Sequence, residues 1–148
     1  MKKRNFNAWA NWKTQKGVPT IVKELESIQE EYQGSDLAEK IHAYLQECYR
    51  KWGAGLFVLL GGDVNIIPAR YFNVPPGQKY AGDYPSDAYY TDLNCDWNAN
   101  KNHLFTEWGK DKNEARQIML YRTCIRRKCK GKLRSLLIKY FCMRKWKI

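Results

Sequence analysis

Five consecutive apolar residues, Leu56–Leu60, constrain the fold of this chain more than any other feature. They follow Gly55 and lead into Gly61 and Gly62, which are typical of tight turns. A strand with no polar alternation is buried on both faces, as in a parallel sheet that is covered by helices. The sequence therefore predicts an α/β protein with this strand in its sheet.

Other segments supply further elements of such a fold. We predict a helix over 6–16, a strand over 19–25, a helix over 37–52 and a strand over 88–93. Gly17 is expected to stop the first helix, and Ser35 to cap the second, with Asp36 in its first turn. A strand–helix–strand unit is almost always a right-handed crossover between parallel strands. The predicted architecture is a three-layer α/β sandwich with a mostly parallel sheet.

The net charge of +11 is distributed unevenly along the chain. Residues 1–114 contain 14 Lys/Arg and all 15 Asp/Glu, whereas residues 115–148 contain 12 Lys/Arg and no acid. Three of the five cysteines, Cys124, Cys129 and Cys142, also lie in this basic tail. The two regions are therefore treated separately, with a boundary at residue 114.

Composition places the chain among globular proteins. Its 148 residues are enough for one domain with a core, and 44% of them are apolar and 14% aromatic. No apolar run approaches 18 residues, so no transmembrane helix is predicted. The first residues carry no apolar stretch of the kind found in secretory signals.

Asp63 follows the Leu56–Leu60 strand at the edge where α/β proteins gather functional groups. Gly61 and Gly62 match neither G-x-G-x-x-G nor G-x-x-x-x-G-K-[ST], which argues against a phosphate-binding loop. Two interpretations stay open for Asp63. It holds the turn by accepting backbone N–H groups, or it is a functional carboxylate.

Four segments, in order and at sensible spacing, resemble the gingipain-type cysteine peptidases. They are "NWKTQKGVPTIVK" (Asn11–Lys23), "FVLLGGDVNIIPARYF" (Phe57–Phe72), "PSDAYYTDLNCDWNAN" (Pro85–Asn100) and "FTEWGKDK" (Phe105–Lys112). The resemblance covers about residues 8–112. It implies the first half of a caspase-like catalytic domain, an incomplete half-domain of a secreted or cell-surface bacterial enzyme. Such enzymes cut polypeptides with a Cys–His pair and require no cofactor.

The resemblance does not reach a catalytic pair. The family's histidine lies in a Gly-His-Gly turn and its cysteine follows a later strand, and neither context occurs around His42 or His103. His42 and Cys48 are expected on the core side of the second helix, and His103 in a solvated loop. Asp96 next to Cys95 disfavours a thiolate there. We therefore assign no catalytic residue and predict that this chain alone is inactive.

By the same resemblance, Asp87 lies near the substrate end of the sheet. Asp63 and Asp87 are therefore candidates for shaping a substrate cleft. An ordinary turn or helix-cap role for Ser86 and Asp87 is an equally open interpretation.

The segment "TDLNCDWNANKN" carries oxygen-bearing side chains at every second position, which suits the hard-oxygen preference of Ca²⁺. The candidate ligands are Asp92, Asn94, Asp96, Asn98, Asn100 and Glu107. Trp97 replaces the glycine of a Ca²⁺ loop, and His103 replaces its final glutamate. The alternatives are a structural Ca²⁺ site, which the resemblance supports, and a polar loop rich in Asx turns.

Three interpretations apply to residues 115–148. The first is a cationic module that binds nucleic acid or an anionic membrane, because apolar residues occur at helical spacing among Lys and Arg. A zinc site is the second, and the cysteines lack a matching histidine. In the third, the tail is translated out of frame. Residues 120–124 can be encoded by bases that, one position along, read Tyr-Ile-Gly-Arg-Val, the apolar-Gly-Arg strand expected in the family.

The sequence thus favours a fragment of a gingipain-type endopeptidase with a polypeptide as substrate of the parent enzyme. The alternative is a non-enzymatic cationic module acting through residues 115–148. No specific nucleic-acid partner is favoured, and the oligomeric state is not predicted.

Overall fold

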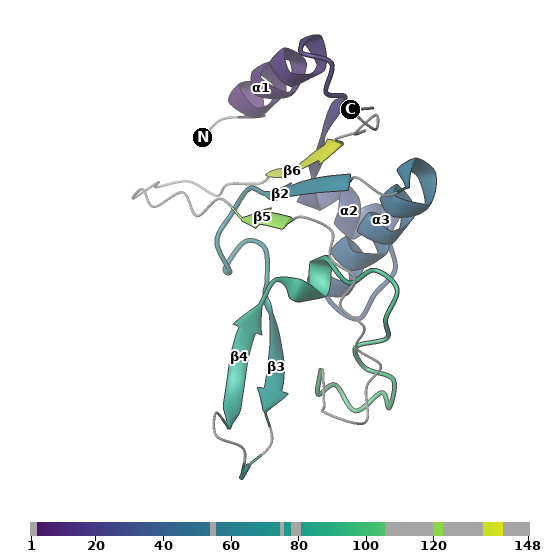
Figure 1. The fold of residues 1–148 in the computed structure, drawn as a ribbon, viewed down its shortest axis with the longest axis vertical. Coiled ribbons are helices and arrows are strands. Elements are labelled where there is room, and N and C mark those ends of the chain that lie inside the picture. Colours follow the sequence, from purple (N-terminus) through teal and green to yellow (C-terminus); the bar gives the residue numbers. More distant parts are fainter. Residues whose placement is uncertain are drawn as a thin grey trace, which may run out of the picture.

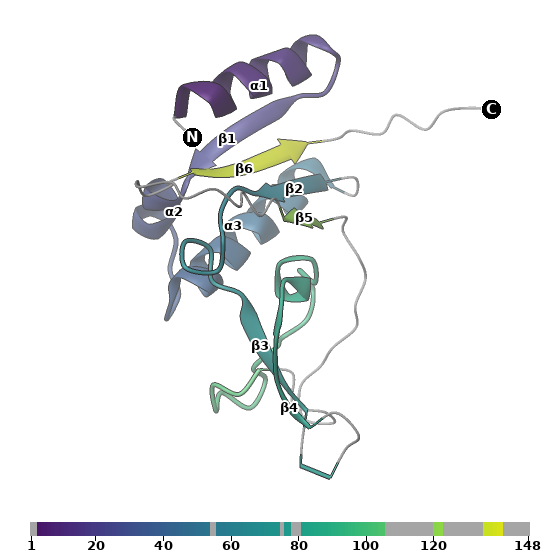
Figure 2. The same ribbon diagram turned by 90° about the vertical axis from the view of Figure 1, so that its left-hand side faces the viewer.

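The structure is a computed structural model that describes residues 3–53, 56–74, 76–77, 81–105, 120–122 and 135–140. Its elements are α1 (Lys3–Gln15), β1 (Thr20–Glu24), α2 (Leu25–Glu31), α3 (Leu37–Trp52), β2 (Leu56–Leu60), β3 (Arg70–Val74), β4 (Gly82–Ser86), the 3-10 helix η1 (Ala88–Tyr90), β5 (Leu120–Arg122) and β6 (Ser135–Tyr140). Along the long axis, α1 lies at one end, a sheet in the middle and the β3–β4 hairpin at the other end (Figures 1 and 2). None of the described helices is long and apolar enough to cross a membrane.

Helix α1 ends as the sequence predicts. The amide of Gly17 donates to the carbonyl of Thr14, and the amide of Val18 donates to the carbonyl of Lys13, each at 3.0 Å. Gly17 has a φ of +81°, which a residue with a Cβ rarely adopts. These two bonds form a Schellman motif, so the predicted helix and its glycine stop are confirmed.

The next segment contains one confirmed strand, one unpredicted helix and one misplaced cap. Strand β1 continues directly into the short helix α2, which the sequence analysis did not predict. The cap of α3 is Asp36, whose carboxylate accepts the amide of Glu39 at 2.9 Å. Ser35 lies one residue earlier, and its amide and hydroxyl donate to the Glu39 carboxylate. The predicted cap at Ser35 was therefore wrong by one residue.

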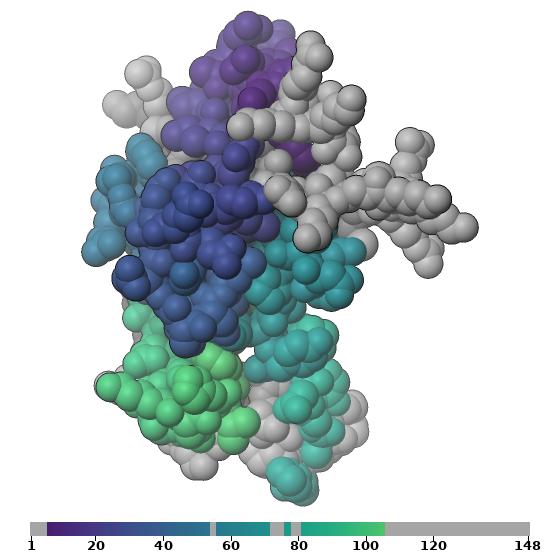
Figure 3. All heavy atoms as spheres, turned by 180° about the vertical axis from the view of Figure 1, so that it is seen from behind, coloured from purple at the N-terminus to yellow at the C-terminus, as the bar shows by residue number. Residues whose placement is uncertain are grey.

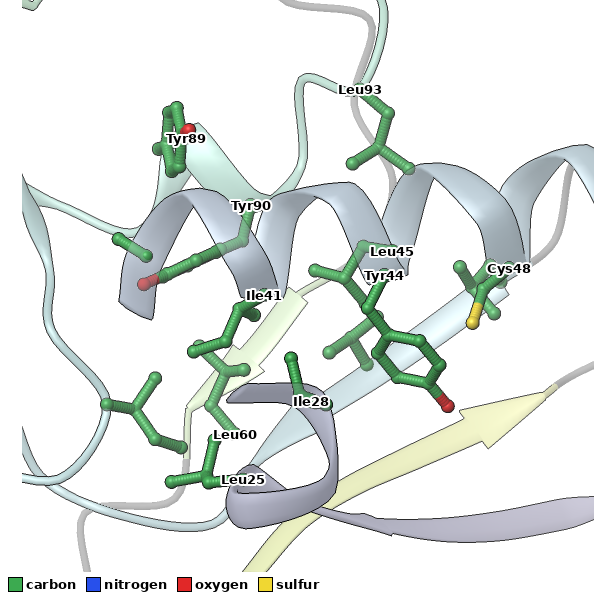
Figure 4. Close-up of a cluster of buried hydrophobic side chains, with 14 of the residues drawn as sticks. Leu25, Ile28, Ile41, Tyr44, Leu45, Cys48, Leu60, Tyr89, Tyr90 and Leu93 are labelled. Carbon is green, nitrogen blue, oxygen red and sulfur yellow. The ribbon is translucent and has the colours of Figure 1, made fainter. Parts of the chain in front are cut away.

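The core joins β2 to α2 and α3. Ile41 and Leu45 of α3 meet Ile28 of α2 and Leu60 of β2, and all four are fully buried (Figure 4). Burial of each such side chain contributes about 1.5–3 kcal/mol relative to exposure. Alternate residues of β2 are only half-buried on the opposite face, so the prediction of full burial on both faces holds for one face alone.

The four-stranded sheet has the order β1-β6-β2-β5. β2 pairs parallel with β5, whereas β6 pairs antiparallel with both β1 and β2. The prediction of mostly parallel pairing was therefore wrong for the described strands, because a strand from the basic tail separates β1 from β2. Helices α2 and α3 pack on this sheet, and α1 contacts β1 and β6. The fold is mixed α/β with a small sheet, and a three-layer sandwich stays a prediction.

Residues 88–93 do not form the predicted strand. Ala88–Tyr90 form η1, in which the carbonyl of Asp87 accepts the amide of Tyr90 at 3.0 Å. Ser86 reinforces this turn, because its hydroxyl accepts the amide of Ala88 at 3.1 Å. Both tyrosines of the turn are buried, which explains why apolar character alone suggested a strand. The β3–β4 hairpin, which the sequence analysis did not predict, precedes this turn.

Candidate functional site

A cavity of about 340 Å³ lies between α3 and the segment 91–105 that follows η1. Figure 3 shows this segment (green) as a lobe packed against the α3 region (blue). The residues that line the cavity are Glu39, His42, Gln46, Tyr89, Asn94, Cys95, Asp96, Trp97, Asn98 and Phe105. A concave space with convergent polar groups is the usual form of a ligand site.

Two side chains of α3 hold the loop that forms the far wall. Nε2 of His42 lies 2.9 Å from the carbonyl oxygen of Asp92, and Nε2 of Gln46 donates to the carbonyl of Leu93 at 2.9 Å. His42 and Gln46 are four residues apart and therefore share one helix face. Because a carbonyl only accepts, the hydrogen of the neutral imidazole is on Nε2.

His42 is a buried structural group. Only 7% of it is exposed, and its ring stacks on Tyr89 with a centroid distance of 4.5 Å and an interplanar angle of 25°. Burial lowers the pKa of the imidazole, so it is neutral at pH 7. The prediction of a buried histidine on this helix is confirmed.

Arg70, at the start of β3, packs against two aromatic residues that line the cavity, Tyr89 and Phe105. Its guanidinium makes two bonds to the carboxylate of Asp36, at 2.5 and 2.8 Å, and lies 3.6 Å from a Glu39 oxygen. The guanidinium carbon lies 4.0 Å from the ring centroid of Phe105 and 4.9 Å from that of Tyr89. Burial opposes the charge, but the hydrogen bonds and negative charge of Asp36, together with Tyr89, outweigh it and raise the pKa of Arg70.

Tyr89 is the centre of an aromatic cluster. Its ring meets Trp97 at 5.4 Å and Phe105 at 6.1 Å, both edge to face. Burial raises the pKa of Tyr89 to about 12, so its hydroxyl stays protonated. The cluster forms a rigid apolar wall that supports the cavity.

Five of the six side chains predicted to bind calcium lie on the described loop, and three of these five accept backbone hydrogen bonds. The observed bonds run from the amide of Asn98 to Asp96, from that of His103 to Asn98 and from that of Asn102 to Asn100, at 3.0–3.1 Å. Asn94, Asp96 and Asn98 line the cavity, and Glu107 lies outside the described residues. The described loop thus contains Asx turns of the kind expected by the alternative interpretation, and calcium binding stays a prediction.

Asp92 differs from the other candidate ligands because it points into the core. Only 2% of it is exposed, and Oδ2 accepts the indole N–H of Trp97 at 3.0 Å. Its Oδ1 is buried without a hydrogen-bond partner in the described part of the chain. Nowhere among the described residues do three His, Cys, Asp or Glu side chains form a group that could hold a metal ion.

Asp63 and Asp87 do not line the cavity. The carboxylate of Asp63 is exposed and accepts the amide of Asn65 at 3.0 Å, and its carbonyl accepts the amides of Ile66 and Ile67. The turn role of Asp63 is therefore confirmed. Asp87 precedes η1, and a cleft-shaping role for either residue stays a prediction.

The described thiols occupy different environments. Cys48 is 1% exposed and belongs to the core, as predicted. Cys95 is half-buried in the cavity wall that also contains His42. His103 is exposed with a φ of +64°, in agreement with a solvated loop.

Three residues that shape this site were not predicted: Gln46, Arg70 and Tyr89. No local pattern marks Arg70, because its partner Asp36 is 34 residues away. The Ser-Asp-x-Tyr-Tyr segment did signal Tyr89, but as part of a strand. The sequence did contain a signal for a buried turn, namely aromatic residues flanked by residues that favour turns.

Comparison with known proteins identifies the family to which this chain is related. The profile of Peptidase family C25 matches residues 3–127, which is more than half of the chain and extends into the basic tail. No curated protein and no solved structure matches the chain. The matched residues include β1, α3, β2, η1 and the cavity loop, whereas β6 lies beyond the match. The chain belongs to peptidase family C25, the gingipain family of cysteine peptidases.

Proposed function

We propose that this chain is a fragment of a C25 cysteine endopeptidase. The fragment forms part of the scaffold around a thiol-dependent peptide-cleaving site, and it does not itself cleave peptides. Family membership supports the substrate class, a polypeptide, and the thiol chemistry of the parent enzyme. Extracellular or cell-surface location is proposed on the same basis.

The environments of the described cysteines and histidines support the proposal that the chain does not itself cleave peptides. A thiol nucleophile needs access to substrate and a partner that removes its proton. Cys48 is enclosed in the core, and the Nε2 hydrogen of His42 is committed to the Asp92 carbonyl. Cys95 has access to the cavity, but the neighbouring Asp96 disfavours its thiolate.

A peptidyl epoxide, which alkylates activated peptidase thiols, tests whether Cys95 is an activated nucleophile. Under native conditions, labelling of Cys95 is expected to be no faster than labelling of a thiol in the urea-unfolded chain, as read by peptide mass mapping. Cys95→Ser provides the control for site assignment. Native labelling of Cys95 at least about tenfold faster than unfolded labelling would contradict the proposal.

Calcium binding by the loop of Asp92–Asn100 is a separate proposal. It is supported by the unpaired Oδ1 of Asp92 and by the position of Asn94, Asp96 and Asn98 around one cavity. Oxygens that now accept backbone amides have to turn toward the ion, so the ion would reorganise the loop.

The basic tail supports the alternative function, a cationic module. Residues 115–148 carry 12 Lys/Arg and no acid, which favours binding to a polyanion. Such binding has to weaken steeply with salt and disappear when the tail charges are removed. The proposal that the tail is out of frame is tested by the nucleotide sequence: it requires a one-base shift near codons 113–119 that opens a long frame encoding His and Cys.

A further inference from the structure

The gap between β1 and β2 is one strand wide, and β6 fills it. Ile138 of β6 pairs with Ile21 of β1 on one side and with Val58 of β2 on the other. Leu137 pairs in the same way with Val22 and Leu59. β6 is thus a central strand, held by backbone pairing along both edges (Figure 2).

β6 has a different origin from its neighbours. β1, β2 and β5 run in the same direction and lie within residues 3–127, which the family profile matches. β6 runs against them and lies at 135–140, beyond the match. Residues of the family-like region therefore build both walls of the gap, while a segment from outside that region occupies it.

The empty gap would be a strong template for a strand. Among the described residues, β6 alone pairs with the facing edges of β1 and β2. Without it, two rows of backbone N–H and C=O groups face each other across the width of one strand. The filling segment, Ser135–Tyr140, contains three consecutive apolar residues, which suits a central position.

The connection to β6 is long enough for exchange between molecules. β5 ends at Arg122 and β6 begins at Ser135, so the link is residues 123–134. The two strands lie on either side of β2, so these ends are roughly 10 Å apart across the sheet. Twelve residues can span up to roughly 40 Å. A link of this length can therefore place β6 in the gap of its own molecule or in the gap of a neighbouring molecule.

We propose that residues 135–140 are a donor strand and that the gap between β1 and β2 is an acceptor groove, so that two copies of this chain exchange their donor strands. A dimer with exchanged strands contains the same strand pairing as two separate monomers, so the equilibrium between monomer and dimer depends on protein concentration. Tethering through twelve residues gives the chain's own donor an effective concentration on the order of millimolar. The chain is therefore monomeric at micromolar concentration and exchanges donor strands near millimolar concentration. When its own donor is blocked, its groove is open to a donor strand supplied from outside.

Leu137→Pro in the full chain blocks the donor, because proline cannot donate to the ladder and disrupts a central strand. The probe is a fluorescein-labelled synthetic peptide of residues 133–141. We expect the variant to bind it at least about tenfold more tightly than the wild type, whose groove is filled. Arg144→Pro, beyond β6, is the matched control and should bind like the wild type. A peptide that carries proline at position 137 should bind to neither.

Two outcomes overturn the proposal. The first is equal affinity of the wild type and L137P for the peptide, or no binding to L137P. If L137P is unfolded alone, the peptide has to restore its helical circular dichroism, and failure to do so counts as no binding. The second is wild-type chain that remains monomeric by light scattering up to millimolar concentration, since exchange requires a dimer that L137P does not form.

Discussion

The carboxylate of Asp36 caps helix α3 and simultaneously binds Arg70 through two hydrogen bonds, although the two residues are 34 positions apart. One side chain thus joins the first turn of α3 to the start of β3. The Arg70 side chain is 10% exposed and that of Asp36 is 45% exposed, so the pair lies at the border of the core. The aromatic cluster around Tyr89 covers the guanidinium from the other side.

Substitution of Arg70 tests this junction. We expect Arg70→Ala to lower the free energy of unfolding by about 2–3 kcal/mol, a value reduced for the exposure of Asp36. The loss combines the ion pair with the packing against Phe105. Arg70→Lys should be intermediate, because lysine lacks the two-pronged geometry.

Urea unfolding, followed by circular dichroism, provides the measurement. Lys51→Ala is the matched control, since Lys51 forms an exposed pair with Glu47 one helical turn away. That variant should change stability by no more than about 0.5 kcal/mol. Equal losses for Arg70→Ala and Lys51→Ala would show that the Arg70 pair is not a structural junction.

Local signals predicted the elements that depend on local chemistry. Gly17 stops α1 and Asp63 holds its turn, because each depends on neighbours within a few residues. The β-branched residues of Thr20–Glu24 marked a strand, although its pairing partner β6 is distant in the sequence. The Arg70–Asp36 pair and the His42–Asp92 contact depend on segments that meet only in the folded chain. Sequence periodicity contains no information about such pairs.

The mostly parallel pairing was mispredicted for a related reason. The crossover rule gives the relative direction of β1 and β2, and that direction is observed. The rule does not say whether another strand lies between them. Ser135–Tyr140 was interpreted as part of a basic tail with apolar residues at helical spacing, and this was wrong because the segment forms strand β6.

His42 predicts a specific pH dependence of stability. Burial lowers its pKa in the folded chain, so the unfolded chain binds the proton more readily. Stability contributed by the neutral imidazole is therefore present above about pH 6.5 and is lost as the pH falls below that value. The slope should be positive and no larger than about 1.4 kcal/mol per pH unit, the limit for one titrating group.

Unfolding free energies measured between pH 5 and 8 check this. His42→Gln keeps an N–H donor on the same face but does not titrate, so the slope should flatten. His103→Gln removes the exposed histidine and should leave the slope unchanged. A slope that persists in His42→Gln and disappears in His103→Gln would contradict the assignment.

Asp63 should contribute through hydrogen bonding and not through charge. Asp63→Asn retains an oxygen for the amide of Asn65, so we expect little change in stability. Asp63→Ala removes the acceptor and should lower the free energy of unfolding by about 0.5–1.5 kcal/mol. Thermal or urea unfolding of both variants distinguishes the roles, and equal losses would point to the charge.

Calcium should raise the melting temperature if the loop of Asp92–Asn100 binds it. An ion that binds only the folded chain stabilises it by about 2.7 kcal/mol at 100 times its dissociation constant. Differential scanning fluorimetry with Ca²⁺, with Mg²⁺ as the ionic control, measures this shift. Asp96→Asn should reduce the shift, whereas Asp83→Asn, on β4, should not. Absence of any shift at millimolar Ca²⁺ would contradict the calcium proposal.

Peptide hydrolysis by the purified chain tests the central claim most directly. The chain should release no fluorophore from a quenched peptide library above the buffer rate, under reducing conditions and with Ca²⁺ present. Cys48→Ser and Cys95→Ser should give the same baseline. Turnover by the wild-type chain that Cys95→Ser or His42→Gln abolishes would contradict the account, because it would show a working thiol site built from this chain's own residues.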